Sequence, residues 1–278
     1  MVKLGLSSLA FINDCRIYGK YNDAQDILID ASQKALNFAE ENEISICELI
    51  LDPPLNKDDD NVEKFIELCN SFTNITKQVH APYIDINLAS HNVWIREASI
   101  ECYEYIAKIC KKIGSKIYTI HPGSTRYLKN YNKKINFSKL FQSVNYLLEK
   151  ISYLDLIVCI ENMQKKTGIL TTLEEILYFF NNINRNDIFF TWDTSHSWTC
   201  NVDVGELWGE LHDKIKNIHL VDNFSKNSDI HPALGTGKIN FNEIFDVMSQ
   251  YNYNDSIILE IGSIKNLKGS IEFVLKFF

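Results

Sequence analysis

Residues 156–193 read LIVCIENMQKKTGILTTLEEILYFFNNINRNDIFFTWD, and this stretch decides the fold class. A short apolar run, Leu156 to Glu161, is followed by an amphipathic segment, Leu173 to Ile183, and then by a second short run, Ile188 to Asp193. Short apolar runs that alternate with segments of helical period are typical of βα repetition and a parallel sheet. Each run also ends on a carboxylate, at Glu161 and at Asp193.

The same alternation continues along the whole chain and predicts eight strands. With amphipathic segments between them and a length of 278 residues, they favour a closed (β/α)₈ TIM barrel over an open doubly wound sheet. No Gly-x-Gly-x-x-Gly motif follows the first strand, which disfavours a dinucleotide-binding fold. Without a linker or a change in composition, we expect one domain over residues 1–278. The other six predicted strands are Lys3 to Ser8, Ile46 to Leu51, Lys77 to His80, Lys116 to His121, Ile215 to Leu220 and Ser256 to Glu260.

Composition excludes several classes of protein. Hydrophobic residues make up 45% of the chain and charged residues 23%, which is the balance of a globular protein with a large core. No apolar run approaches the ~20 residues needed to cross a bilayer, and the N-terminus lacks the pattern of a secretory signal, so we expect a cytoplasmic protein. The seven cysteines form no Cys-x-x-Cys pair and are expected to be reduced and mostly buried. A net charge of -8 argues against general attraction to nucleic-acid phosphates, and nothing implies a protein partner.

Histidines and carboxylates gather at the predicted carboxyl ends of the strands, where the catalytic residues of TIM barrels lie. A single histidine there is more often a hydrogen-bonded core or capping residue than a ligand. Nine such groups in one barrel mouth would repel one another or stay unsatisfied without cations, and imidazole with carboxylate is the ligand set of zinc and related divalent ions. The predicted ligands are His80, His121, Glu161, Asp193, His196, His219, Asp229, His231 and Glu260.

These residues lie in motifs that resemble those of endonuclease IV, within the xylose-isomerase-like barrel superfamily. The resemblance covers the third to the eighth predicted strand. It implies a cluster of up to three zinc ions, since all nine ligands of that family have an identical counterpart in this chain. The motifs are His80 to Ala89, His121 to Ser124, Glu161-Asn162, Asp193 to His196, His219 to Asp222, Asp229 to His231 and Leu259-Glu260.

The resemblance also implies which ligands share an ion. His80 and His121 would hold one zinc, with Glu161 bridging it to a second. Asp193, His219 and Glu260 would complete the second site, whereas His196, Asp229 and His231 would hold the third. Tyr83 matches an aromatic residue that touches DNA in endonuclease IV, and Lys238 lies in Gly235 to Ile239, which resembles the glycine turn after the last ligand pair of the family. Both are predicted to bind substrate.

A cluster of this kind supports hydrolysis of a phosphodiester. Water between two zinc ions is acidified toward a pKa of about 7, and a third cation can stabilise the charge on the phosphate and the leaving oxygen. On this hypothesis the substrate is DNA, cut 5′ of an abasic site. Residues 122–136 contain no Asp or Glu but carry Arg126 and Lys129 among tyrosines, a pattern that suits a phosphate backbone and an exposed base.

One observation weakens the DNA hypothesis, and two alternatives stand beside it. The loop Asp52 to Asp60 contains three consecutive aspartates and lacks the basic and aromatic residues that probe the abasic site in endonuclease IV. The runner-up is an isomerase or epimerase of a sugar or sugar phosphate. It would use Mn²⁺ or another divalent ion bound by Glu161, Asp193, His219 and Glu260, and the two glutamates would move protons beside a carbonyl. A third reading is a metal-stabilised barrel without catalysis, because fold alone does not fix function.

Overall fold

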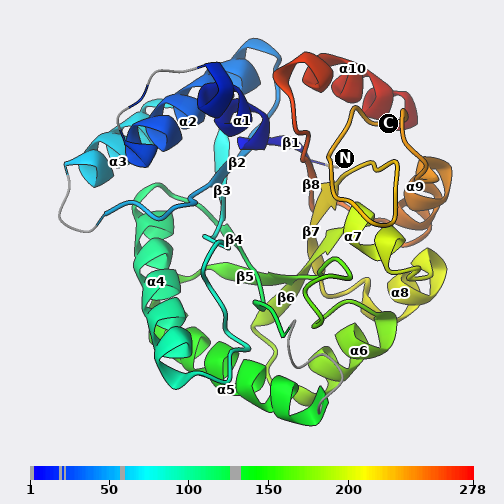
Figure 1. Cartoon of the computed structure of the whole chain (residues 1–278). Coiled ribbons are helices and arrows are strands. Elements are labelled where there is room, and N and C mark those ends of the chain that lie inside the picture. Colours follow the sequence, from blue (N-terminus) through cyan, green and yellow to red (C-terminus); the bar gives the residue numbers. More distant parts are fainter. Residues whose placement is uncertain (1–2, 19–20, 22, 57–59, 126–132) are drawn as a thin grey trace.

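The computed structural model contains a closed barrel of eight parallel strands in sequence order, β1 to β8, surrounded by helices (Figure 1). It describes all residues except 1–2, 19–20, 22, 57–59 and 126–132. The predicted barrel is therefore confirmed, and each predicted strand matches an observed one to within two residues at either end. The strands are β1 (Lys3–Ser7), β2 (Ile46–Ile50), β3 (Thr76–His80), β4 (Ile117–Ile120), β5 (Ile157–Glu161), β6 (Ile188–Asp193), β7 (Ile215–Leu220) and β8 (Ser256–Leu259).

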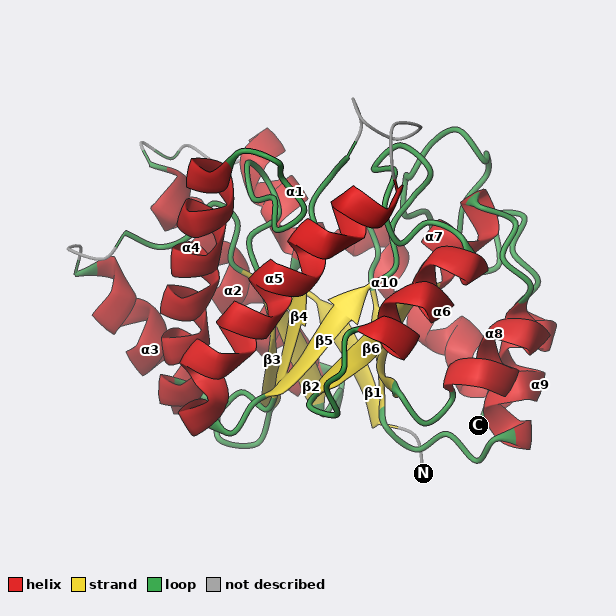
Figure 2. Ribbon diagram, turned by 90° about the horizontal axis from the view of Figure 1, so that it is seen from below, coloured by secondary structure: helices red, strands yellow, loops and turns green. Residues whose placement is uncertain are grey.

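Helices cover the outside of the barrel, and the strands run toward the face that carries the long βα loops (Figure 2). Two helices, α1 and α7, are not separate elements of the sequence prediction. They are extra helices in the loops after β1 and β6, where the pattern of one helix per strand gives no reason to expect them. The helices are α1 (Leu9–Tyr18), α2 (Ala24–Glu41), α3 (Asn61–Ser71), α4 (Val93–Lys112), α5 (Lys133–Ile151), α6 (Leu173–Asn182), α7 (Thr194–Thr199), α8 (Val204–Leu211), α9 (Phe241–Gln250) and α10 (Ile264–Val274), with 3₁₀ turns at Ser152–Leu154 and Leu275–Phe277.

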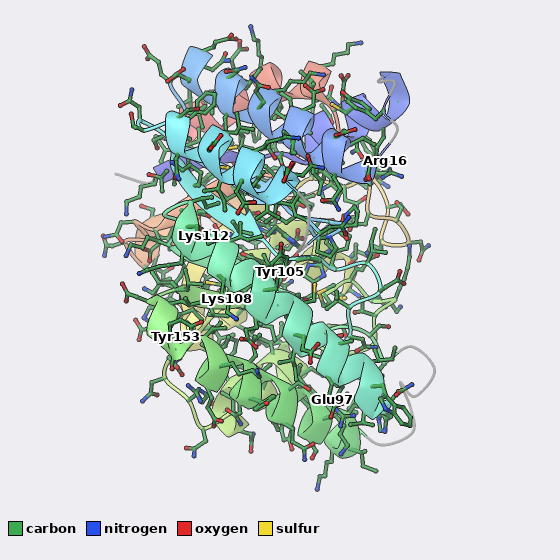
Figure 3. The ribbon with its side chains drawn as sticks, turned by 90° about the vertical axis from the view of Figure 1, so that its left-hand side faces the viewer. Arg16, Glu97, Tyr105, Lys108, Lys112 and Tyr153 are labelled. Carbon is green, nitrogen blue, oxygen red and sulfur yellow. The ribbon has the colours of Figure 1, made fainter. Side chains whose placement is uncertain are left out.

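Several helices, α2, α4, α6 and α8, begin at a capping side chain and bury an apolar face. In α2 the Asp23 side chain accepts a hydrogen bond of 2.9 Å from the backbone N of Gln25, and Leu28, Ala31 and Ala35 are buried at helical spacing. On α4 the buried residues face the barrel, whereas the charged residues Glu97 and Lys108 are exposed on the outer side of the helix, as Figure 3 shows. These apolar faces of the helices pack against the strands and form the outer layer of the core.

The inside of the barrel is polar below its mouth. Thr119 of β4 and Thr191 of β6 share a hydrogen bond of 2.9 Å across the barrel. Asn217 of β7 donates to Glu48 of β2, also at 2.9 Å. Because side chains alternate between the two faces of a strand, the next inward position on three of these strands falls at the mouth, at His121, Asp193 and His219. Strand periodicity therefore sets which polar residues meet there.

All seven cysteines are free thiols, and five of them are buried, in agreement with the expectation from the sequence. Within the described residues, no helix is both long and apolar enough to cross a membrane.

Candidate metal centre

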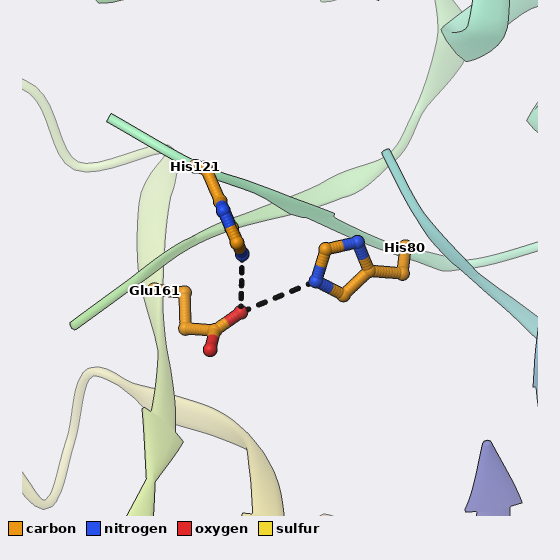
Figure 4. Close-up of side chains that lie close together, drawn as sticks. All are labelled: His80, His121 and Glu161. Carbon is orange, nitrogen blue, oxygen red and sulfur yellow. Dashed lines mark hydrogen bonds and ion pairs between the residues drawn. The ribbon is translucent and has the colours of Figure 1, made fainter. Parts of the chain in front are cut away.

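The nine predicted ligands all lie around the mouth of the barrel, and Glu161 at the end of β5 is at the centre of the group. Its Oε2 atom is 3.3 Å from His80 Nε2 and 3.0 Å from His121 Nε2, as Figure 4 shows. The same oxygen is 3.5 Å from His219 Nδ1, and the other carboxylate oxygen is 3.2 Å from His196 Nδ1. The carboxylate of Glu161 therefore lies within 3.5 Å of four imidazoles, which come from four different parts of the chain.

Two sets of ligand atoms are close enough to share an ion. The ligand atoms of His80, His121 and Glu161 lie within 4.8 Å of one another, as do those of Glu161, Asp193 and His219. Zinc bonds to nitrogen and oxygen are about 2.0–2.2 Å long, so a cation inside either set needs only small side-chain shifts. Glu161 belongs to both sets, which is the arrangement that a bridging carboxylate requires.

Two buried atoms in the second set have no hydrogen-bond partner among the described residues. They are Asp193 Oδ2 and His219 Nδ1. The other oxygen of Asp193 accepts a hydrogen bond of 2.6 Å from the backbone N of His196 and caps α7. Because unsatisfied buried polar atoms are costly, their convergence with Glu161 fits a bound cation. The donor set therefore fits a divalent metal.

The third predicted group lies beside the other two. Asp229 lies between two imidazoles, with Oδ2 3.1 Å from His196 Nε2 and Oδ1 3.4 Å from His231 Nε2. Glu260, just past the end of β8, is 3.3 Å from His219 Nδ1. All nine side chains thus come together, as the motifs predict, and their roles as ligands stay a prediction.

The electrostatics of this cluster reflect a shortage of positive charge. Burial lowers the pKa of His231, but the hydrogen bond to Asp229 and the charges of Glu260, Asp229 and Asp193 together outweigh this effect and raise the pKa to about 10. Burial raises the pKa of Asp193 to about 7. For Glu161, burial acts to raise the pKa, yet the neighbouring histidines bring it well below the usual value. Without a metal, protons on the histidines balance the carboxylates, so a cation would replace protons.

The cluster lines a cavity of about 520 Å³ that mixes apolar and polar surface. Tyr83 is part of its wall, and its ring lies 5.3 Å from that of His121 between centroids. Asn13, Ser124 and Gln164 bring uncharged polar side chains to the same wall. This volume is within the usual range for small-molecule sites.

Loop packing explains why the motif residues around the ligands are needed. Asn87 donates a hydrogen bond of 2.7 Å to the backbone O of Ser124 and joins the loop after His80 to the loop after His121. Gly123 has a φ of 92°, and a Cβ atom there would lie 2.6 Å from the Cα of Asn87. Only glycine therefore allows the two loops to approach this closely.

Asp222 is buried and holds the glycine turn rather than a metal ligand. It accepts hydrogen bonds of 2.7 Å from the backbone N of Gly237 and 3.3 Å from that of Ile239. Lys238 is exposed in that turn and is not among the residues that line the cavity, so its role in substrate binding stays a prediction. Two further predicted substrate contacts, Arg126 and Lys129, lie outside the described residues.

Glu48 is the functional candidate that the sequence analysis missed. It lies inside β2, fully buried, with Oε1 2.9 Å from His219 Nε2. The sequence interpretation considered only residues at strand ends, whereas Glu48 lies two residues before the end of its strand. A charged residue in an otherwise apolar strand was the available signal.

The chain belongs to the xylose isomerase-like TIM barrel family, whose model matches residues 23–277. An uncharacterised protein of Methanocaldococcus jannaschii is 28% identical over 96% of this chain and 95% of its own length. A probable endonuclease 4 of Thermosipho melanesiensis is 31% identical over 65% of this chain and 68% of its own length. Among solved structures, a D-tagatose 3-epimerase-like protein aligns with a TM-score of 0.82 at 22% identity, over 99% of this chain and 97% of that one.

Proposed function

We propose that the chain is a divalent-metal-dependent isomerase or epimerase that acts on a small sugar or sugar phosphate. The observation that carries this proposal is the pairing of Glu161 and Glu260 around one ligand site. Glu161 ends β5 and Glu260 follows β8, and their carboxylates lie 3.5 and 3.3 Å from His219 Nδ1. Two carboxylates beside one metal site can remove and return a proton on a bound substrate.

In this proposal each residue has a separate task. Glu161, Asp193, His219 and Glu260 would hold the metal, which supplies polarisation of a carbonyl oxygen when bound. One of the two glutamates takes the proton from the carbon beside that carbonyl, and the other returns a proton at the same or the neighbouring carbon. Glu260 is 8% exposed and lines the cavity, so it can reach a substrate. Asn13, Ser124 and Gln164 would bind the hydroxyl groups of the sugar.

The surroundings of the cavity favour a small substrate over DNA. A volume of about 520 Å³ suits a sugar, and the net charge of -8 opposes a polyanion. Asp52, in the loop after β2, adds another carboxylate near the mouth and accepts a hydrogen bond of 3.0 Å from the backbone N of Ile84. For these reasons we favour an isomerase or epimerase of a sugar over the phosphodiester hydrolase that the sequence motifs favour. This choice also agrees with the activity named for the epimerase-like structural neighbour.

A phosphodiester hydrolase is the second candidate, because one-metal proton transfer leaves five of the gathered residues without a task. If further ions bind, the chain would resemble its probable endonuclease 4 relatives in function as well as in sequence. Zinc would be the expected metal, at up to three ions per chain, and DNA with abasic sites the substrate. The five residues are His80, His121, His196, Asp229 and His231.

One variant separates the two candidates. His121 belongs to the first ligand set but not to the four residues that the isomerase needs. We expect His121→Ala to retain most ketose conversion, measured by sugar chromatography on a panel of ketoses and their phosphates, with about one metal per chain. The matched control is Glu175→Gln, a buried glutamate that accepts from Thr171 outside the site.

The opposite results would favour hydrolysis. These are two or three zinc ions per wild-type chain, EDTA-sensitive cleavage of an oligonucleotide with an abasic site, and loss of that cleavage in His121→Ala. A metal-loaded protein that converts no sugar and cleaves no abasic DNA would contradict both candidates.

A further inference from the structure

Glu48 connects the polar interior of the barrel to the metal centre. Its side chain is fully buried, and Oε1 lies 2.9 Å from His219 Nε2. Its other oxygen accepts a hydrogen bond of 2.9 Å from Asn217 Nδ2, two residues earlier on β7. Asn217 is held in turn by Ser256, whose hydroxyl donates to Asn217 Oδ1 at 2.7 Å. One oxygen of Glu48 therefore has a hydrogen-bond donor, whereas Oε1, which forms no hydrogen bond to the described residues, faces the imidazole of His219.

His219 is oriented differently from two other candidate ligands. His80 and His231 each place Nδ1 against a backbone carbonyl oxygen, at 2.8 and 3.0 Å. A carbonyl oxygen only accepts hydrogen bonds, so Nδ1 carries the hydrogen in these residues and Nε2 faces the cluster. In His219 it is Nδ1 that faces Glu161 and Glu260. Its Nε2 must therefore carry the hydrogen if Nδ1 is to bind a metal.

A competing arrangement lies close by. Asn217 Nδ2 is also 3.3 Å from His219 Nε2 and could donate to it. In that arrangement the hydrogen of a neutral imidazole would move to Nδ1, where it would block coordination of a cation. Glu48 opposes this arrangement, because its Oε1 lies 2.9 Å from Nε2 and can only accept a hydrogen bond there.

We propose that Glu48 is a positioning residue that keeps Nδ1 of His219 turned toward the metal and thereby sets the affinity of the Glu161, Asp193 and His219 site. Glu48 acts through His219 and is not among the residues that line the cavity. The inference rests on the metal site of the proposed function, which both candidate reactions share, and it is independent of the substrate.

The test compares metal binding by the wild type, Glu48→Gln and the matched control Glu175→Gln. Metal-free protein is titrated with Co²⁺, and the dissociation constant is obtained from the visible absorption of the bound ion. Loss of a carboxylate partner of a ligating histidine typically weakens metal binding by about 10–100-fold, and we expect that weakening in Glu48→Gln. Glu175→Gln should bind Co²⁺ like the wild type. An unchanged dissociation constant in Glu48→Gln, even with a lower melting temperature, would overturn the proposal, because a purely structural carboxylate gives that result.

A rescue variant distinguishes positioning from general damage. In the double variant Glu48→Gln/Asn217→Asp, the new amide can donate to the new carboxylate and still present its oxygen to His219. We expect this pair to recover most of the lost Co²⁺ affinity, whereas failure to recover it would count against the proposal.

A measurement on the wild type keeps the proposal testable if the variants do not fold. Long-range ¹H–¹⁵N spectra of the zinc-loaded wild type should show His219 protonated at Nε2 and metal-bound at Nδ1. Zinc bound at Nε2 would refute the proposal. If Glu48→Gln weakens Co²⁺ binding but the wild type acts on neither sugars nor abasic DNA, only the proposed function fails.

Discussion

Replacement of Glu161 by Gln is the sharpest perturbation of this site. It removes one negative charge and keeps nearly the same shape. Glu161 contacts His80 and His121 at 3.3 and 3.0 Å and belongs to both ligand sets, so the change affects either possible ion. We therefore expect a loss of metal, whichever of the two ligand sets holds it.

The size of this loss follows from electrostatics. Two unit charges about 4 Å apart interact by about 4 kcal/mol at an effective dielectric constant of about 20. Since each 1.4 kcal/mol is about tenfold in affinity, metal binding should weaken by about a thousandfold. The two charges of a divalent ion would increase this attraction, whereas desolvation of the buried carboxylate offsets part of it, so about a thousandfold is the expected order of magnitude.

The assay is metal content after dialysis against a buffered free-metal concentration, measured by mass spectrometry of the elements. Wild type and the control Glu175→Gln should retain their metal, and Glu161→Gln should lose it together with activity. If Glu161→Gln kept the metal content of the wild type, the reasoning that places Glu161 at the centre of the site would be refuted.

Three further predictions follow from the cluster and the turn beside it. Because the pKa of His231 is raised to about 10 and that of Asp193 to about 7, both groups stabilise the metal-free fold in their protonated forms. The contribution of Asp193 is lost as the pH rises from about 4 to about 7, and that of His231 as it rises from about 6.5 to about 10, so the melting temperature in EDTA should fall across both ranges, and a flat profile would contradict the shifts. Removal of those protons favours the metal, so Zn²⁺ affinity should rise over the same ranges, and calorimetry in two buffers of different ionisation enthalpy should detect proton release. Asp222→Ala leaves the buried backbone N–H groups of the glycine turn without their acceptor, which should cost about 1–3 kcal/mol in urea unfolding while the metal content stays unchanged.

The sequence by itself determined the barrel and most of the site. Apolar runs of strand length, separated by amphipathic helices such as α2 and α6, have few ways to bury their faces other than a closed parallel barrel. Once the strands are placed, residues at their carboxyl ends, such as His80 and Glu161, must share one mouth. Local pattern and chain order are enough for both conclusions.

Only the tertiary structure decided which atoms face one another. The position of Glu48 against His219 depends on the stagger of β2 and β7 across the barrel, which no local pattern encodes. The same holds for Asp222, which follows a candidate ligand in sequence yet turns its carboxylate to the loop around Gly237. Strand periodicity fixes the face on which a side chain lies, but contacts across a barrel depend on the closure of all eight strands, and for that reason they appear only in the folded molecule.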